Sequence, residues 1–194
     1  MNFTQKHLKE TAAIANLIDP ERVEDMISKI AEIKKNQGRI FFIGVGGSAA
    51  NASHAVNDFR KLAGIESYAP TDNIAEITAR TNDEGWETVF VEWLRTSRLQ
   101  SNDCLFVLSV GGGNREFNVS VNICEAIEYA TALGAYVTGI VGKHESHLSK
   151  FSNSYLEIPL VNSDSVTPHA ESFQEVIWHL MVSHPLLNSN ATKW

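Results

Sequence analysis

Two short apolar segments each run directly into a glycine-rich loop that a helical pattern follows. Residues 39–43 and 104–108 are apolar runs of the kind that form buried parallel strands. The loops 44–48 and 109–114 come next, and a periodic helical segment continues from each of them. Strands that alternate with helices in this order predict a parallel sheet with helices on both faces.

The remaining periodic segments complete an α/β domain with three layers, helix on sheet on helix. Helices are predicted at 4–16 and 20–36, and Asp19-Pro20 supplies the start signal of the second one. The further predicted helices cover 49–62, 73–80, 84–98, 118–133 and 167–183. Three more strands, at 66–70, 136–141 and 155–158, bring the sheet to five. Because no linker or low-complexity segment interrupts the pattern, we expect one domain over 1–194, with its sheet core at 38–186.

The overall composition excludes several classes of protein. Hydrophobic residues make up 43% and charged residues 20% of the chain, as in ordinary globular proteins. The net charge of -7 and the lack of a Lys/Arg stripe argue against a nucleic-acid partner. No apolar run approaches the roughly 18 residues of a membrane span, and the first residues do not resemble a signal peptide. With Cys104 and Cys124 expected as reduced core thiols, the sequence predicts a cytoplasmic protein.

The two glycine loops are candidate anion sites. Ligands of parallel α/β sheets bind beyond the carboxyl ends of the strands, where helix N-termini offer free N–H groups. The sequence is neither a P-loop nor a dinucleotide fingerprint, because the Gly-Lys-Ser/Thr ending and the third glycine are both absent. The alternative is a pair of ordinary strand-to-helix turns. The candidate binding residues are Gly46, Gly47 and Ser48 in the first loop and Ser109, Gly111, Gly112 and Asn114 in the second.

Histidines and carboxylates recur on two of the predicted helices. His54 and Asp58 are four residues apart, so both lie on one helix face. Such a pair can provide a catalytic base, bind a metal ion, or form a structural hydrogen bond. On the last helix, Glu171 and His179 are eight residues apart, about 12 Å along a straight helix. They reach one ion only if both side chains lean inward or if one acts in a neighbouring subunit. His7, His144 and His147 are expected at the surface.

These segments together resemble the bacterial phosphoheptose isomerases, which have the sugar-isomerase (SIS) fold. Residues 44–54, Gly-Val-Gly-Gly-Ser-Ala-Ala-Asn-Ala-Ser-His, are similar to that family's Gly-Asn-Gly-Gly-Ser…Asp-Ala…His signature. Residues 81–87 resemble its Asn-Asp…Gly-aromatic-Glu segment, and the loop from Ser109 falls at its phosphate loop. The helix with Gln174 and His179 is similar to its last catalytic helix. The resemblance spans nearly the whole chain in the same order.

The resemblance implies a flavodoxin-like domain in a homotetramer, with residues 1–37 used in oligomerisation and active sites between subunits. It implies an isomerase that interconverts sedoheptulose 7-phosphate and an aldose, D-glycero-D-manno-heptose 7-phosphate, with one zinc ion per site. Residue by residue, His54, Asp58, Glu171 and His179 correspond to the zinc ligands, and Asp58 and His179 to the acid/base pair in either order. Asn82, Asp83 and Gln174 correspond to substrate contacts.

Several departures from the family pattern leave alternatives open. Val45 replaces the signature asparagine, Asp58 is one methylene shorter than the family's glutamate, and the second loop has lost hydroxyl groups. The last helix has a second alignment, in which Gln174-Glu175 match and no histidine falls at the family's position. The sequence therefore also fits an isomerase of another phosphosugar, or a non-catalytic protein of this fold that binds a sugar phosphate or acts as an adaptor.

Overall fold

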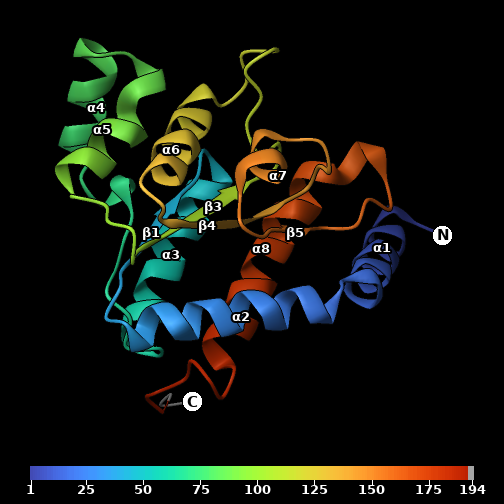
Figure 1. Cartoon of the computed structure of the whole chain (residues 1–194). Helices are drawn as coiled ribbons and strands as arrows, with labels where there is room; N and C mark the ends of the chain where they lie inside the picture. The colour runs from blue at the N-terminus through green and yellow to red at the C-terminus, as the bar shows by residue number, and fades with distance from the viewer. Residues whose placement is uncertain (192–194) are drawn as a thin grey trace.

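The computed structural model describes residues 1–191 and has the architecture that the sequence predicts (Figure 1). The last three residues of the predicted 1–194 domain lie outside the described part. Five strands form one sheet in the order β2-β1-β3-β4-β5, and all neighbouring pairs are parallel. The strands are β1 (Ile40–Ile43), β2 (Ser67–Tyr68), β3 (Cys104–Ser109), β4 (Tyr136–Val141) and β5 (Leu156–Glu157).

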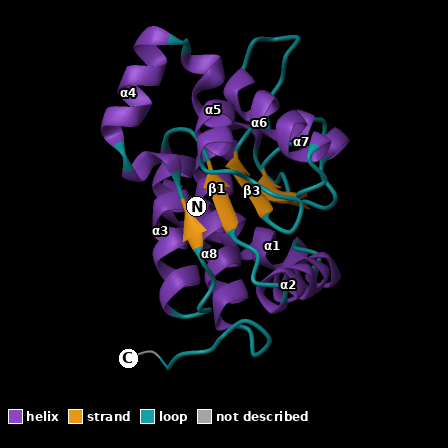
Figure 2. Cartoon of the chain, turned by 60° about the vertical axis from the view of Figure 1, so that its left-hand side comes forward, coloured by secondary structure: helices purple, strands orange, loops and turns teal. Residues whose placement is uncertain are grey.

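Helices cover both faces of this sheet, as Figure 2 shows. One face carries α2 (Pro20–Lys35), α3 (Gly47–Lys61) and α8 (Val166–Ser183), and the other carries α5 (Val89–Thr96), α6 (Val121–Ala132) and α7 (His147–Phe151). Successive side chains of a strand point to opposite faces. Phe42 and Phe106 therefore join the α2–α3–α8 core, while Phe41 and Val107 join the other core.

The N-terminal helices begin where the sequence places them. Asp19 accepts a hydrogen bond from Glu21 N at 3.0 Å and caps α2. Asn2 and Gln5 form a capping box at the start of α1 (Phe3–Leu17). Ile14 is the buried residue of α1, whereas α2 buries five apolar side chains. α1 is thus attached to the body of the domain by a much smaller apolar contact than α2.

Some predicted boundaries are wrong. The helix expected from residue 118 begins at Val121, because Asn114 and Val119 pair as a small hairpin with N–H···O distances of 2.8 and 2.9 Å. The segment 84–98 divides into a 3-10 turn, Trp86–Thr88, and the shorter α5. Further 3-10 turns lie at Pro70–Asp72, before α4 (Ile74–Asp83), and at Ser163–Ser165. Within residues 1–191, no helix combines the length and the apolar character that crossing a membrane requires.

Candidate functional site

Three of the predicted site residues meet along the line where α3 packs against α8, which is called the α3–α8 groove below. Asp58 Oδ2 lies 3.5 Å from His179 Nε2 and 4.0 Å from His54 Nε2. The other oxygen of Asp58 accepts a hydrogen bond from Asn57 Nδ2 at 2.7 Å. The Asp58 side chain is 13% exposed, while both histidine rings are open to solvent on one side. An oriented carboxylate therefore faces two imidazoles at an accessible surface.

Two neighbours of this cluster were not among the predicted site residues. Glu175 Oε1 lies 3.4 Å from His54 Nδ1. The buried Trp178 ring packs against both imidazoles, with ring centroids 4.7 Å from His54 and 3.6 Å from His179. Glu175 stands four residues before His179, so the same spacing rule that paired His54 with Asp58 also indicates it. The contacts with the buried Trp178 ring restrict the positions of both histidine rings.

Helices α3 and α8 pack parallel to each other, so polar pairs follow one another along the groove. Gln174, which is fully buried, donates from Nε2 to Ser48 Oγ at 3.1 Å and accepts from Asn51 Nδ2 at 3.0 Å. Asn51 also donates to the backbone oxygen of Glu171 at 2.8 Å. The amide of Gln174, predicted as a substrate contact, is thus engaged in joining the two helices.

The first glycine loop meets a carboxylate. Gly46 has φ 64° and ψ −128°, a conformation open to glycine, and no side chain caps the N-terminus of α3. A Cβ on Gly47 would lie 2.5 Å from Glu171 Oε2, so the Glu171 carboxylate packs directly against this loop. Glu171 therefore occupies the end of α3 that attracts anions. The group of close donor atoms contains His54, Asp58 and His179, and Glu171 is not a member of it.

The second glycine loop is shaped by its own serine. Ser109 Oγ, which is buried, accepts a hydrogen bond from Gly112 N at 2.9 Å. Gly112 has φ 65°, and a Cβ there would collide with the Ser146 side chain at 2.5 Å. Gly111, in contrast, faces open space. Asn114 Oδ1 accepts from Phe117 N at 2.9 Å and so stabilises the hairpin rather than the glycine turn.

A charged network lies beside the second loop. Arg115 donates to Glu125 at 2.8 Å and, through two nitrogens, to Glu128 at 2.9 and 2.8 Å. These carboxylates raise the pKa of Arg115, and Arg115 in turn lowers the pKa of Glu128. The ring of His147 lies 3.0 Å from Glu128 and is 9% exposed, so its predicted surface position is wrong. Burial lowers the pKa of His147.

Asn82 and Asp83 lie apart from these groups, at the end of α4, which projects from the sheet at the upper left of Figure 1. Both are exposed, and Asn82 donates to Asp83 at 2.7 Å. Sequence similarity had grouped them with the substrate contacts. Among residues 1–191, neither side chain forms a hydrogen bond or an ion pair with a glycine loop or a histidine.

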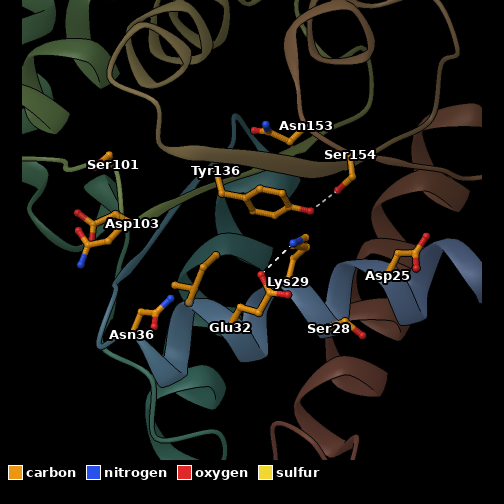
Figure 3. A pocket seen from close by; sticks show the side chains of 12 residues that line it. Asp25, Ser28, Lys29, Glu32, Asn36, Ser101, Asp103, Tyr136, Asn153 and Ser154 are labelled. Atoms are coloured by element: carbon orange, nitrogen blue, oxygen red, sulfur yellow. Dashed lines mark hydrogen bonds and ion pairs between the residues drawn. The ribbon is translucent and has the colours of Figure 1, made fainter.

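A cavity of about 590 Å³ lies beside α2, at the amino ends of β3 and β4 (Figure 3). Its lining includes Lys29 and Glu32 of α2, which pair at 2.8 Å, and Tyr136, which pairs with Ser154 at 2.6 Å. Ligands of parallel α/β sheets bind at the carboxyl ends instead. Size alone therefore does not make this cavity the candidate active site.

The groove cluster fits a zinc ion by its chemistry. Imidazole and carboxylate are donor types that zinc prefers, and one donor atom from each of His54, Asp58 and His179 lies within 4.8 Å of the others. The accessible side of the cluster leaves room for a further ligand. Three protein ligands with an open fourth position are the donor set that catalytic zinc sites generally use.

Comparison with known proteins now identifies the family. The model of the SIS domain matches residues 8–142. The chain belongs to the SIS domain family. A phosphoheptose isomerase of Aneurinibacillus thermoaerophilus is 25% identical over 190 residues, which cover 93% of this chain and 90% of that protein. This SIS protein is therefore related to phosphoheptose isomerases along nearly its full length.

Two further comparisons concern a lincomycin biosynthesis protein with a similar sequence and a solved structure with the same fold. The lincomycin biosynthesis protein LmbN of Streptomyces lincolnensis is 31% identical over 154 residues, which cover 76% of this chain but 56% of that longer protein. The structure of phosphoheptose isomerase GmhA from Neisseria gonorrhoeae superposes with a TM-score of 0.80 at 22% identity, over 93% of this chain and 95% of that one. The predicted SIS fold is thereby confirmed.

Proposed function

We propose that this protein is a ketose–aldose isomerase of a phosphorylated sugar, with sedoheptulose 7-phosphate as its substrate. The observation that carries the proposal is the meeting of Asp58 with His54 and His179, whose rings are exposed to solvent. A protein that only binds a sugar phosphate does not require an oriented carboxylate between two imidazoles. The kinship with phosphoheptose isomerases supports the choice of sugar.

Isomerisation moves a proton between neighbouring carbons through an enediol, and it needs a base, an acid and a group that stabilises the oxyanion. In our proposal the Asp58 carboxylate takes the proton from the carbon beside the carbonyl and returns it to the former carbonyl carbon. His179 moves the proton between the two oxygens. The hydrogen bond from Asn57 holds Asp58 so that its second oxygen stays directed at the histidines.

Zinc would be held by His54, Asp58 and His179. When bound, it supplies a positive charge that polarises the sugar carbonyl. Glu171, at the first loop, would have to change rotamer to join these three residues. Glu175, 3.4 Å from His54, is placed as an alternative fourth ligand.

The phosphate group is proposed to bind at the second glycine loop. The Glu171 carboxylate would repel a phosphate at the first loop, whereas the second loop is open at Gly111 and can offer backbone N–H groups. Gly111 faces open space, which makes Gly111→Asp a direct test. We expect Gly111→Asp to raise the KM for the sugar phosphate at least tenfold by charge repulsion. The uncharged isostere Gly111→Asn should change it little.

The acid/base cluster lies far along α3 from the glycine loop that begins the helix. Asp58 is eleven residues after Gly47, about 16 Å along the axis. On the outer face of α8, Val176 and Leu180 are exposed next to the cluster. We therefore propose that a neighbouring subunit covers this groove and completes the site, in a homotetramer that also uses the exposed Phe3 and Leu8 of α1. The proposed assembly would use residues 1–37, as the family resemblance implies.

The test is turnover of sedoheptulose 7-phosphate by the purified chain with and without added zinc, followed by NMR in D₂O. We expect the aldose product, with solvent deuterium on the carbon that receives the proton. Asp58→Asn and His179→Ala should each lower kcat by at least a hundredfold. Matched controls are Asp164→Asn and His144→Ala, an exposed carboxylate and an exposed imidazole on other elements. Full activity of Asp58→Asn would refute the assignment.

Two other outcomes distinguish the alternatives. Turnover of a different ketose phosphate from a small panel would support the proposed isomerase chemistry but change the proposed substrate. Saturable thermal stabilisation by sugar phosphates without turnover of any would establish a binding protein. Mixing Asp58→Asn with Gly111→Asp subunits tests the shared site at a substrate concentration far below the raised KM, where neither variant alone has more than about a tenth of the wild-type activity. Random pairing in hybrids should then restore roughly a quarter of it.

A further inference from the structure

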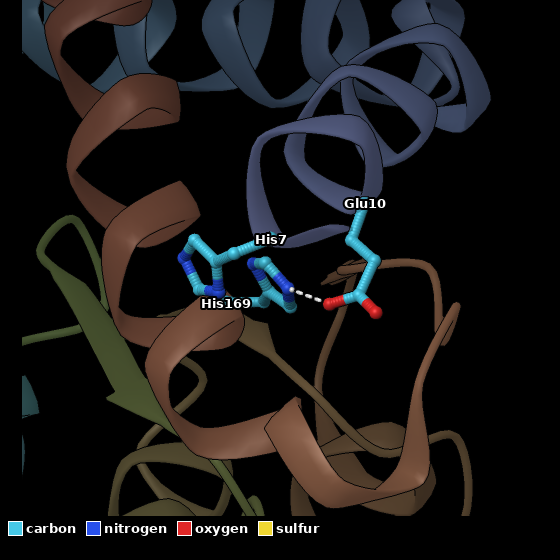
Figure 4. A group of neighbouring side chains, drawn as sticks. All are labelled: His7, Glu10 and His169. Atoms are coloured by element: carbon cyan, nitrogen blue, oxygen red, sulfur yellow. Dashed lines mark hydrogen bonds and ion pairs between the residues drawn. The ribbon is translucent and has the colours of Figure 1, made fainter. Parts of the chain in front are cut away.

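A second cluster of two histidines and a carboxylate lies between helix α1 and helix α8, as Figure 4 shows. His7 and Glu10 are three residues apart on α1 and therefore lie on one helix face. His169 lies in the first turns of α8. One donor atom from each of the three lies within 4.8 Å of the others. This cluster shares no residue with the groove formed by His54, Asp58 and His179.

The contacts within the cluster hold its carboxylate and one ring in place. His169 Nε2 lies 3.1 Å from Glu10 Oε2, and the His169 residue is 4% exposed. Asn162 donates to the other oxygen of Glu10 at 2.9 Å. The hydrogen bond from His169 lowers the pKa of Glu10, which keeps this carboxylate ionised. The ring of His7 stacks on that of His169, with centroids 4.4 Å apart.

We propose that His7, Glu10 and His169 form a second site for a divalent transition metal of the zinc class. Two imidazoles and a carboxylate make a donor set that zinc prefers. Asn162 acts as the outer partner that orients the ligating carboxylate. On binding, the ion takes the place of the proton between His169 and Glu10, and the ring of His7 turns out of its stack so that a nitrogen faces the ion. Water fills the fourth position.

This metal would fasten α1 to the body of the domain. Ile14 is the buried residue of α1, so the contacts of Glu10 with His169 and Asn162 are a large part of its attachment. The ion would link a helix at the start of the chain to one that begins at residue 166. Because the ligands converge only in the folded chain, metal binding stabilises the docked helix. The site therefore has a structural role, separate from the chemistry proposed for the α3–α8 groove.

The first measurement is the zinc content of the metal-stripped, reloaded full chain after equilibrium dialysis, without any sugar. We expect about two zinc ions per chain for the wild type and about one for either His7→Ala or His54→Ala. His7 is half-buried on α1 and alanine favours helices, so His7→Ala should fold. His144→Ala is the matched control, because His144 pairs with Glu157 at 2.8 Å without a third ligand and should keep the wild-type content.

A second readout reports on the position of the metal. Added zinc should slow hydrogen exchange of the α1 amides in the wild type and in His54→Ala, and not in His7→Ala. The proposal is overturned if His7→Ala keeps the wild-type zinc content, or if His54→Ala alone abolishes binding. One zinc ion that is lost in His7→Ala and kept in His54→Ala would support it. None of these results depends on whether the protein is an isomerase.

Discussion

The buried amide of Gln174 offers a quantitative test of how the site is held. Gln174→Leu keeps a side chain of similar size but removes the hydrogen bonds to Ser48 and Asn51. The Ser48 hydroxyl is 1% exposed, so it loses its partner in a place that water does not reach. An orphaned buried hydroxyl costs about 1–3 kcal/mol, and the bond from Asn51 adds about 0.5–1.5 kcal/mol. Asn51 keeps its bond to the backbone of Glu171.

We therefore expect Gln174→Leu to lower the free energy of unfolding by roughly 2–4 kcal/mol. For a chain of this length, this corresponds to a fall in Tm of roughly 5–15 °C. The assay is thermal and urea unfolding at one fixed protein concentration, because oligomers unfold in a concentration-dependent way. Gln100→Leu, at an exposed position, is the matched control and should change the free energy by less than about 0.5 kcal/mol.

The double variant decides whether the orphaned hydroxyl is the cause. Ser48→Ala removes the group that Gln174→Leu leaves without a partner, so the two changes together should cost less than the sum of the single changes. We expect a coupling of about 1–2 kcal/mol. Strict additivity, or a loss below about 0.5 kcal/mol for Gln174→Leu alone, would refute the view that this amide joins α3 to α8.

Three further predictions concern the second loop and the thiols. Gly112→Ala should destabilise the protein by about 1–3 kcal/mol, since φ is 65° and the Cβ meets Ser146, whereas Gly111→Ala should be neutral in the same unfolding assay. Arg115→Met should lower the unfolding free energy by about 0.5–1 kcal/mol at pH 7. This difference should shrink as the pH falls through the lowered pKa of Glu128, because a protonated carboxyl group no longer forms an ion pair with the arginine. A difference that stays constant throughout the acid titration of the carboxylates would contradict it. The free, buried thiols of residues 104 and 124 should react with a thiol reagent only after unfolding, and rapid labelling of the native chain would disprove their burial.

The fold was predictable because its signals are local and agree with one another. Strands β1 and β3 are buried on both faces of the sheet, and the runs 39–43 and 104–108 are accordingly apolar at the strand positions. The proline after Asp19 marks the start of α2. The start of α6 was not predictable in this way. Ser120 adopts the left-handed conformation, and the pairing of Asn114 with Val119 moves the helix start to Val121. Neither feature leaves a periodic signal in the sequence.

The candidate site was predictable only in part, because helical spacing relates residues on one helix and not between helices. The pair of His54 and Asp58 follows from spacing, but the approach of His179 depends on α3 and α8 packing parallel to each other. The same limit explains His7, which was expected at the surface. Its ring lies against His169, a residue more than 160 positions later in the chain. Contacts of this kind require the tertiary structure.

The charges at the two glycine loops bear on which loop would bind the phosphate group. A carboxylate of Glu171 stands at the first loop, where Val45 also replaces an amide with an exposed apolar side chain. A phosphate placed there would meet a like charge, and the free N–H groups of α3 are better suited to sugar hydroxyls. The second loop has open space at Gly111, and the charge of Arg115 after it is balanced by Glu125 and Glu128. Our proposal therefore places the phosphate end of the ligand at the second loop and the reacting end at Asp58. If subunits assemble as we propose, the distance between these two points in the oligomer sets the length of the sugar that fits.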